Sequence, residues 1–148
     1  MKIIVSPNSY KESLSSIDAA NIIVSVLKKN LKNSQIIDLP IADGGDGSLG
    51  VFSKYKNGIT ISTKILSPVG KKINSKYLLF DNGNSAFIEL SDSSGLKLVN
   101  KNLRNPLMYN SYYTGEIILS AIKKVLKKLL LLLEDLLQLM EVLVYCQL

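Results

Sequence analysis

The sequence of 148 residues contains no histidine, no tryptophan, a single cysteine and a single arginine. Without histidine the chain cannot form a histidine metal site or a Ser-His or Cys-His catalytic pair. Cys146 alone cannot form a disulfide bond within the chain, so the composition favours a cytoplasmic protein. The P-loop motif G-x-x-x-x-G-K-[ST] and the dinucleotide motif G-x-G-x-x-G are both absent.

Long apolar runs are also absent from the N-terminus. The first run ends at Pro7 and is too short for the apolar region of a signal peptide. Overall, 47% of the residues are hydrophobic, which predicts one globular domain with a core. The net charge is +6, but the lysines are scattered without interleaved aromatics, so we expect exposed surface charge and no nucleic-acid partner.

The first forty residues have the pattern of a strand, a helix and a second strand. Residues 2–6 form a short apolar run, and apolar residues recur at spacings of three and four over residues 17–31. Ser15 and Asp18 have the form of a helix-capping box. Residues 36–39 form the second short run, so this segment predicts a βαβ unit with parallel strands.

Later segments predict further strands. Residues 59–65 alternate as a half-buried strand does, and residues 76–80 and 85–90 flank an Asn-Gly turn that favours a hairpin. A helical stretch opens at residues 114–116. The predicted fold class is therefore α/β, with an incomplete parallel or mixed sheet, flanking helices and a leucine-rich C-terminal helix.

The sharpest local signal is the glycine-rich segment Ala42-Asp43-Gly44-Gly45-Asp46-Gly47-Ser48, which directly follows a predicted strand. Open α/β sheets bind ligands at such strand ends. Glycines let backbone amides approach a phosphate or carboxylate, and carboxylates suit Mg²⁺. The alternative is a tight turn with solvated acids.

Three single residues also have two interpretations each. Lys11 precedes a predicted helix and could hold a phosphate, or it is one exposed lysine among many. Glu89 could be a site carboxylate, or it marks where a strand reaches water. Arg104 could clamp a carboxylate through two hydrogen bonds, or it is an ordinary surface arginine.

Taken together, residues 1–122 resemble the N-terminal part of the glycerate kinase family. The family's segments P-D-S-F-K-x-S-L-S, P-x-A-D-G-G-E-G-[ST], G-P-L-G, I-E-x-x-x-x-S-G-L and R-N-P-L followed by T-S-Y-G-T-G-E occur in the same order. The corresponding segments here are Pro7–Ser15, Pro40–Ser48, Ser67–Gly70, Ile88–Leu96, Arg104–Leu107 and Asn110–Glu116. Asn8, Asp46 and Tyr113 depart from the family pattern, where an acid, a glutamate and a glycine stand.

The resemblance implies phosphoryl transfer from ATP to a glycerate hydroxyl, with Mg²⁺, by positioning and charge neutralisation. The partners it implies are glycerate and ATP. The residues that it assigns are Lys11 and Asp43 to catalysis, Ser9 and Arg104 to the substrate, Gly44, Gly45, Gly47, Thr114 and Gly115 to the nucleotide, and Asp43 and Asp46 to Mg²⁺.

The tail, residues 123–148, departs from the resemblance. Ten of its last 20 residues are leucine, and no glycine or proline follows residue 116, which predicts helix over most of residues 116–148 with an exposed apolar strip at 129–133. Three acids in those 20 residues argue against a membrane span. Two interpretations of the tail remain: a native helix that associates with itself, and a shift of the reading frame. We prefer the shifted frame, because it can encode the G-G-S-A-T-x-D-x-G loop that the family resemblance leads us to expect.

Two functions follow from these interpretations. The leading one is a glycerate kinase present as a truncated and inactive fragment. The alternative is a non-catalytic protein that associates with itself through the C-terminal helix. A shared site predicts that Lys11 and residues 43–48 converge in the folded chain.

Overall fold

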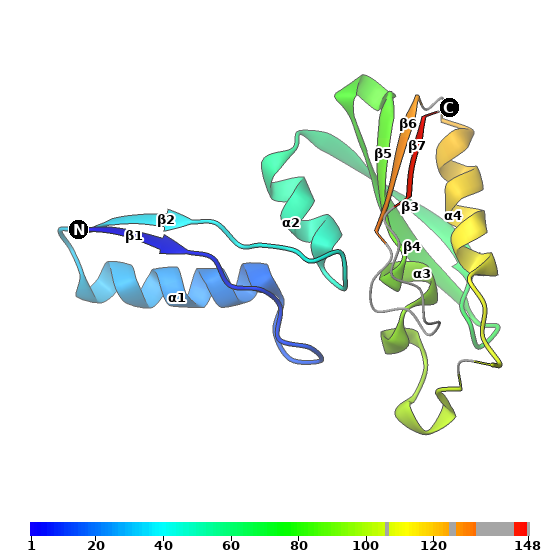
Figure 1. Ribbon diagram of the computed structural model, residues 1–148, viewed down its shortest axis with the longest axis horizontal. Coiled ribbons are helices and arrows are strands. Elements are labelled where there is room, and N and C mark those ends of the chain that lie inside the picture. The colour runs from blue at the N-terminus through cyan, green and yellow to red at the C-terminus, as the bar shows by residue number, and fades with distance from the viewer. Residues whose placement is uncertain (106, 125–126, 133–143, 148) are drawn as a thin grey trace.

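The computed structural model describes residues 1–105, 107–124, 127–132 and 144–147. Two groups of elements lie side by side along the long axis of the molecule (Figure 1). The first is the N-terminal βαβ unit, and the second is a five-stranded mixed sheet with its helices. The predicted α/β class with a parallel and mixed sheet is confirmed.

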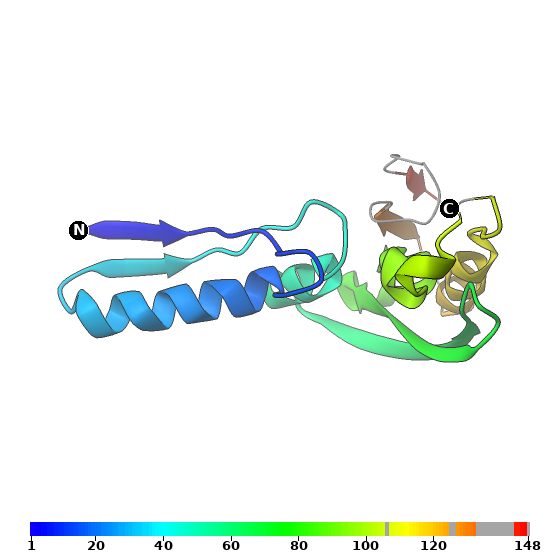
Figure 2. The same cartoon turned by 90° about the horizontal axis from the view of Figure 1, so that it is seen from below.

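The N-terminal unit consists of β1 (Lys2–Val5), α1 (Ser16–Asn30) and β2 (Gln35–Asp38). The two strands are parallel, with Val5 opposite Asp38, and α1 covers one face of the pair (Figure 2). The predicted cap is present: Ser15 Oγ accepts from the Asp18 amide at 3.1 Å and donates to the Asp18 carboxylate at 2.6 Å. The parallel pairing places the loops after β1 and β2 at the same end of the unit.

The second sheet has the order β3-β4-β5-β6-β7. Strands β3 and β4, β4 and β5, and β6 and β7 are antiparallel, whereas β5 and β6 are parallel. The strand bounds are Gly58–Leu66 for β3, Lys72–Phe80 for β4, Ser85–Glu89 for β5, Lys128–Leu132 for β6 and Val144–Gln147 for β7. The predicted hairpin is confirmed: β4 and β5 meet through the 3-10 turn η1 (Asp81–Gly83).

Helices cover both faces of this sheet. Tyr77, Ile88 and Leu129 face α4 (Tyr112–Ile122), whose Ile117 is fully buried against them. On the other face α2 (Ser48–Tyr55) packs through Phe52, which stacks on Phe87 with ring centroids 4.1 Å apart. The second cluster, which also contains Leu49 of α2, packs the start of α2 against β4 and β5.

Short elements connect β5 to α4. They are α3 (Ser91–Ser94), η2 (Leu96–Leu98) and η3 (Lys101–Leu103). Among the helices of the described residues, none is long and apolar enough to cross a membrane.

The C-terminal prediction is wrong for most of the tail that the structure describes. Residues 128–132 and 144–147 are strands and not helix, while residues 133–143 lie outside the described residues. Leucine's helix propensity is a weak preference that tertiary packing overrides. Leu129 and Leu131 are 4% and 9% exposed, so the apolar strip that we expected to be exposed is buried at these two residues. The alternative function, self-association through a C-terminal helix, has no helix in these segments to act through.

Candidate functional site

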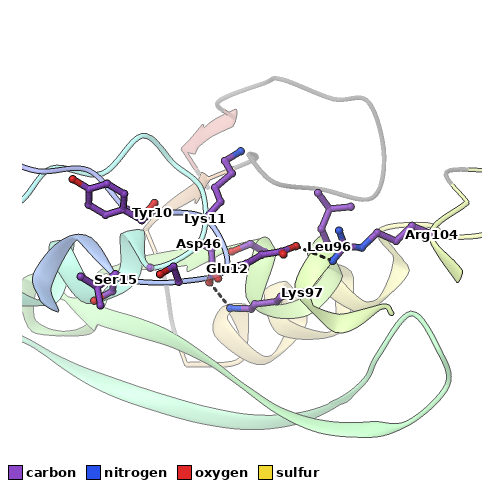
Figure 3. Close-up of a pocket in the computed structure, with 13 residues that line it drawn as sticks. Tyr10, Lys11, Glu12, Ser15, Asp46, Leu96, Lys97 and Arg104 are labelled. Atoms are coloured by element: carbon purple, nitrogen blue, oxygen red, sulfur yellow. Dashed lines mark hydrogen bonds and ion pairs between the residues drawn. The ribbon is translucent and has the colours of Figure 1, made fainter. Parts of the chain in front are cut away.

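A cavity of about 350 Å³ lies where the two groups of elements meet. The loop after β1, the glycine-rich loop after β2, and the segment after β5 all contribute to its lining (Figure 3). The side chains and backbone that line it belong to Ser9, Tyr10, Lys11, Glu12, Ser13, Leu14, Ser15, Asp46, Gly47, Ser91, Leu96, Lys97 and Arg104. The prediction that Lys11 and the 43–48 loop converge is confirmed by this shared lining.

The loop after β1 is closed by its own backbone. The Tyr10 amide donates to the Leu14 carbonyl at 2.8 Å, and the Leu14 amide returns a bond to Tyr10 at 3.0 Å. Glu12 at the tip has φ of +60°, the left-handed region that a residue with a Cβ rarely adopts. Lys11 lines the cavity, but its side chain points away from Asp46 and Lys97 (Figure 3).

The amides of the glycine-rich loop bond within the chain. Gly44 donates to Ser48 Oγ at 3.2 Å, and Gly45 donates to Asp43 Oδ1 at 3.1 Å. Gly47, whose φ is +91°, donates to Glu89 Oε1 at 3.0 Å. In this structure the three N–H groups bond within the chain and hold the shape of the loop, and their assignment to the nucleotide stays a prediction.

Glu89 is the anchor of this loop, and it is only 3% exposed. Its Oε2 accepts from the Leu49 amide at 2.7 Å, and its Oε1 also accepts from Ser91 Oγ at 2.5 Å. A carboxylate at the first amides of a helix satisfies donors that the helix leaves unpaired and favours its positive end. Glu89 therefore positions the start of α2 and the loop before it. Its burial contradicts the interpretation that it marks where a strand reaches water, and Glu89 is not one of the residues that line the cavity.

Asp43 lies at the base of the same loop and, unlike Asp46, does not belong to the cavity lining. Asn8 Nδ2 donates to its Oδ2 at 2.8 Å. This bond is the main reason that the pKa of Asp43 lies below 3.8; burial opposes the shift, and the Gly45 amide and the Lys11 charge add to it. Asn8, which replaces an acid of the family pattern, thus acts as a donor to Asp43.

Lys97 is a site residue that the sequence patterns did not single out. Its Nζ lies 2.5 Å from Asp46 Oδ1 and 3.3 Å from Asp92 Oδ1. Burial disfavours its charge, but the bond to Asp46 and the nearby carboxylates of Asp92, Asp46 and Glu89 outweigh this and raise the pKa of Lys97 above 10.5. The only sequence signal was its position directly after Ser94-Gly95-Leu96.

Arg104 lies on the opposite side of the cavity from Asp46 (Figure 3). Its Nε donates to the Val99 carbonyl at 3.1 Å, and its Nη2 lies 3.5 Å from Glu12 Oε1. Lys101 Nζ is 2.5 Å from Glu12 Oε2, and this bond is the main reason that the pKa of Glu12 falls below 4.5. Arg104 and Lys101 together hold a carboxylate of the chain itself.

Two residues assigned to the nucleotide lie elsewhere. Thr114, in the first turn of α4, is 3% exposed, and its Oγ1 lies 2.8 Å from Ser93 Oγ and 2.9 Å from Ser94 Oγ. Neither Thr114 nor its neighbour Gly115 belongs to the cavity lining. In the described structure Thr114 links α3 to α4.

The described residues do not fit a protein-bound Mg²⁺ at Asp43 and Asp46. In the part of the chain that the structure describes, no group of three or more His, Cys, Asp or Glu side chains is placed to hold a metal ion. Asp43 accepts hydrogen bonds from Asn8 and Gly45, and Asp46 accepts one from Lys97.

Known proteins with similar sequences agree on one family. The family model described as the glycerate kinase family matches residues 3–134. Glycerate 2-kinase of Escherichia coli (strain K12) is 37% identical over 123 residues, which are 83% of this chain and 32% of that protein. Glycerate kinase of Bacillus subtilis (strain 168) is 37% identical over 122 residues, or 82% of this chain and 32% of that protein.

A solved structure gives the same result. The crystal structure of a protein from Salmonella typhimurium LT2, assigned as glycerate kinase 2, superposes with a TM-score of 0.69 and 32% identity. The match covers 92% of this chain and 37% of that one. The chain spans about a third of the length of the curated relatives that it matches. Since the family match covers most of the chain, and the fold agrees with that of the relative, the chain belongs to the glycerate kinase family.

Proposed function

We propose that these residues build the glycerate-binding part of a site at which ATP phosphorylates a glycerate hydroxyl. The observation that carries this proposal is the meeting of three family segments at one cavity: the loop after β1, the glycine-rich loop and the segment after β5. ATP enters as a complex with Mg²⁺, and the reaction takes place in the cytoplasm.

The cavity suits a small hydroxylated acid. Arg104 supplies a planar guanidinium group whose geometry matches a carboxylate. The carboxylate of Glu12 lies 3.5 Å from this group, at the position that we assign to the carboxylate of the substrate. The hydroxyl of Ser9, on the loop after β1, supplies a further hydrogen-bonding group. Asp46, whose side chain is 53% exposed, is an acceptor for a substrate hydroxyl.

Phosphoryl transfer depends mainly on alignment of the two substrates and on neutralising the charge of the transferred group. Lys11 is the residue that we assign to a phosphate, since it lines the cavity and sits at an exposed loop tip. Asp43 contributes through the shape of the glycine-rich loop, where its carboxylate accepts the Gly45 amide. These assignments divide the cavity into a carboxylate end at Arg104 and a hydroxyl end at Asp46.

Calorimetric titration of the 148-residue chain with D-glycerate tests this proposal. We expect Arg104→Met to weaken binding by about tenfold or more, because a hydrogen bond to a charged group contributes roughly 1.5–3 kcal/mol. Lys28→Met, an exposed lysine near the far end of α1, is the control and should bind glycerate as the unchanged chain does. Propionate, which keeps the carboxylate and lacks both hydroxyls, should bind more weakly than glycerate. Equal binding of both acids, or an unaffected Arg104→Met, would contradict the proposal.

A further inference from the structure

The ammonium group of Lys97 joins two acids that come from separate segments of the chain. Asp46 belongs to the glycine-rich loop, and Asp92 lies in α3 after β5. Lys97 Nζ is 2.5 Å from the first and 3.3 Å from the second. The side chain of Lys97 is 38% exposed, and Figure 3 shows it extending along the cavity toward Asp46.

Asp92 is itself fixed by the sheet. Its Oδ2 accepts from Ser75 Oγ at 3.1 Å and from the Lys76 amide at 3.1 Å, and Ser75 is fully buried in β4. The sheet thus holds the Asp92 carboxylate through Oδ2 and leaves its other oxygen, Oδ1, facing Lys97. A continuous series of contacts runs from β4 through Asp92 and Lys97 to Asp46 at the cavity.

The carboxylates around this position favour a positive charge between them. The acidic residues around Lys97 are Asp46, Asp92 and Glu89, and each of them favours its positive charge. A divalent ion could neutralise the same oxygens, since hard cations bind carboxylates. Here the chain supplies an ammonium group of its own, which agrees with the lack of a metal-binding group among the described residues.

We propose that the ammonium group of Lys97 takes the place of a metal ion at this site. Lys97 holds Asp46 in position, so that Asp46 accepts a hydrogen bond from a substrate hydroxyl and does not act as a ligand of a protein-bound metal ion. The part that concerns the hydroxyl rests on the proposed function. The part that concerns the cation does not, because it depends only on Lys97 and its two carboxylates. Lys97 is thus a positioning residue, and Asp46 is the residue that touches substrate.

Titration with Mn²⁺, followed by the broadening of assigned amide NMR signals, tests the cation directly. In the unchanged chain we expect no selective broadening at Asp46 and Asp92, because the ammonium group repels the ion. Lys97→Met should gain such broadening and bind Mn²⁺ at least about tenfold more tightly, because a unit positive charge next to the ion is removed. The double variant D92N/K97M should lose this gain.

Two variants separate the role of charge from a general effect of substitution. Lys97→Arg keeps the positive charge and should exclude Mn²⁺ as the unchanged chain does, and Lys28→Met should do the same. Selective broadening at Asp46 and Asp92 in the unchanged chain would overturn the proposal, as would a folded Lys97→Met chain that gains none. If Lys97→Met does not fold, the unchanged chain and Lys97→Arg still decide, because broadening in either would show that metal reaches these carboxylates.

The same samples keep the two proposals apart. If the chain excludes Mn²⁺ as expected but fails to bind D-glycerate, the role of Lys97 in place of a metal ion stands and the proposed function fails. If both hold, Lys97→Met should also weaken D-glycerate binding while leaving propionate binding unchanged, since propionate has no hydroxyl for Asp46. A loss of binding for both acids would instead mean that Lys97 binds the carboxylate and does not position Asp46.

Discussion

Replacing Glu89 by glutamine should destabilise the chain strongly, although the two side chains have the same shape. The carboxylate accepts from the Gly47 amide, the Leu49 amide and the Ser91 hydroxyl, and it is 3% exposed. Glutamine offers one oxygen and one NH₂ group, so one of the buried amide donors would face another donor.

The size of the effect follows from these contacts. A buried N–H left without an acceptor costs about 1–3 kcal/mol, and each remaining bond loses part of the roughly 1.5–3 kcal/mol that a charged acceptor gives. The favourable charge at the start of α2 adds about 0.3–2 kcal/mol. We expect a loss of about 3–5 kcal/mol, a large share of the roughly 5–15 kcal/mol that stabilises an ordinary domain.

Urea unfolding followed by far-ultraviolet circular dichroism measures this loss, and suits a chain that has no tryptophan. The matched control is Glu116→Gln, because Glu116 accepts a single amide, that of Leu66, at 3.0 Å in an exposed position. We expect the control to lose less than about 1 kcal/mol. Equal losses for the two variants, or a Glu89→Gln chain as stable as the unchanged one, would refute the role of Glu89 as anchor.

Three further outcomes follow from the site. Asn8→Leu should raise the pKa of Asp43 toward 3.8, since it removes the main bond that lowers this pKa. A lowered carboxyl pKa contributes stability that is fully present above the unfolded pKa and is lost as pH falls, so the variant should be less stable at all pH values above about 3.8. Carbon-13 NMR of the Asp43 carboxyl group follows the titration, and an unchanged pKa would contradict the role of Asn8. Glu12→Gln should bind D-glycerate roughly two- to fivefold more tightly by calorimetry, since a competing carboxylate leaves Arg104; unchanged or weaker binding would show that Glu12 does not compete. With ATP, Mg²⁺ and glycerate, the 148-residue chain should release no ADP above background in a coupled assay. The reason is that its sequence lacks the G-G-S-A-T-x-D-x-G loop that the family resemblance leads us to expect. Glycerate-dependent release of ADP would contradict this prediction.

Local patterns in the sequence predicted much of the fold. The βαβ unit, the Ser15 cap and the hairpin at η1 depend on spacing and on turn residues a few positions apart, and all three are present. The convergence of Lys11 with the glycine-rich loop followed from the hypothesis that they share a site, and it is also present.

Contacts between distant segments could not be read from the same patterns. Glu89 reaches Leu49 across 40 positions, and Lys97 reaches Asp46 across 51, so nothing local indicates either partner. Of the three glycines assigned to the nucleotide only Gly47 lines the cavity, and the acceptors of the three amides, Ser48, Asp43 and Glu89, are set by the folded chain. The leucines of β6 form a strand because both faces of the sheet bury them, which outweighs their helix propensity.

The most direct measurement of the central claim is the position of bound D-glycerate in the labelled chain, obtained from intermolecular nuclear Overhauser effects. The account predicts contacts from the carbon-bound protons of glycerate to the side chains of Ser9, Asp46 and Arg104, which line one cavity. Contacts confined to another surface of the chain, or no contacts under conditions where the chain is folded, would contradict it.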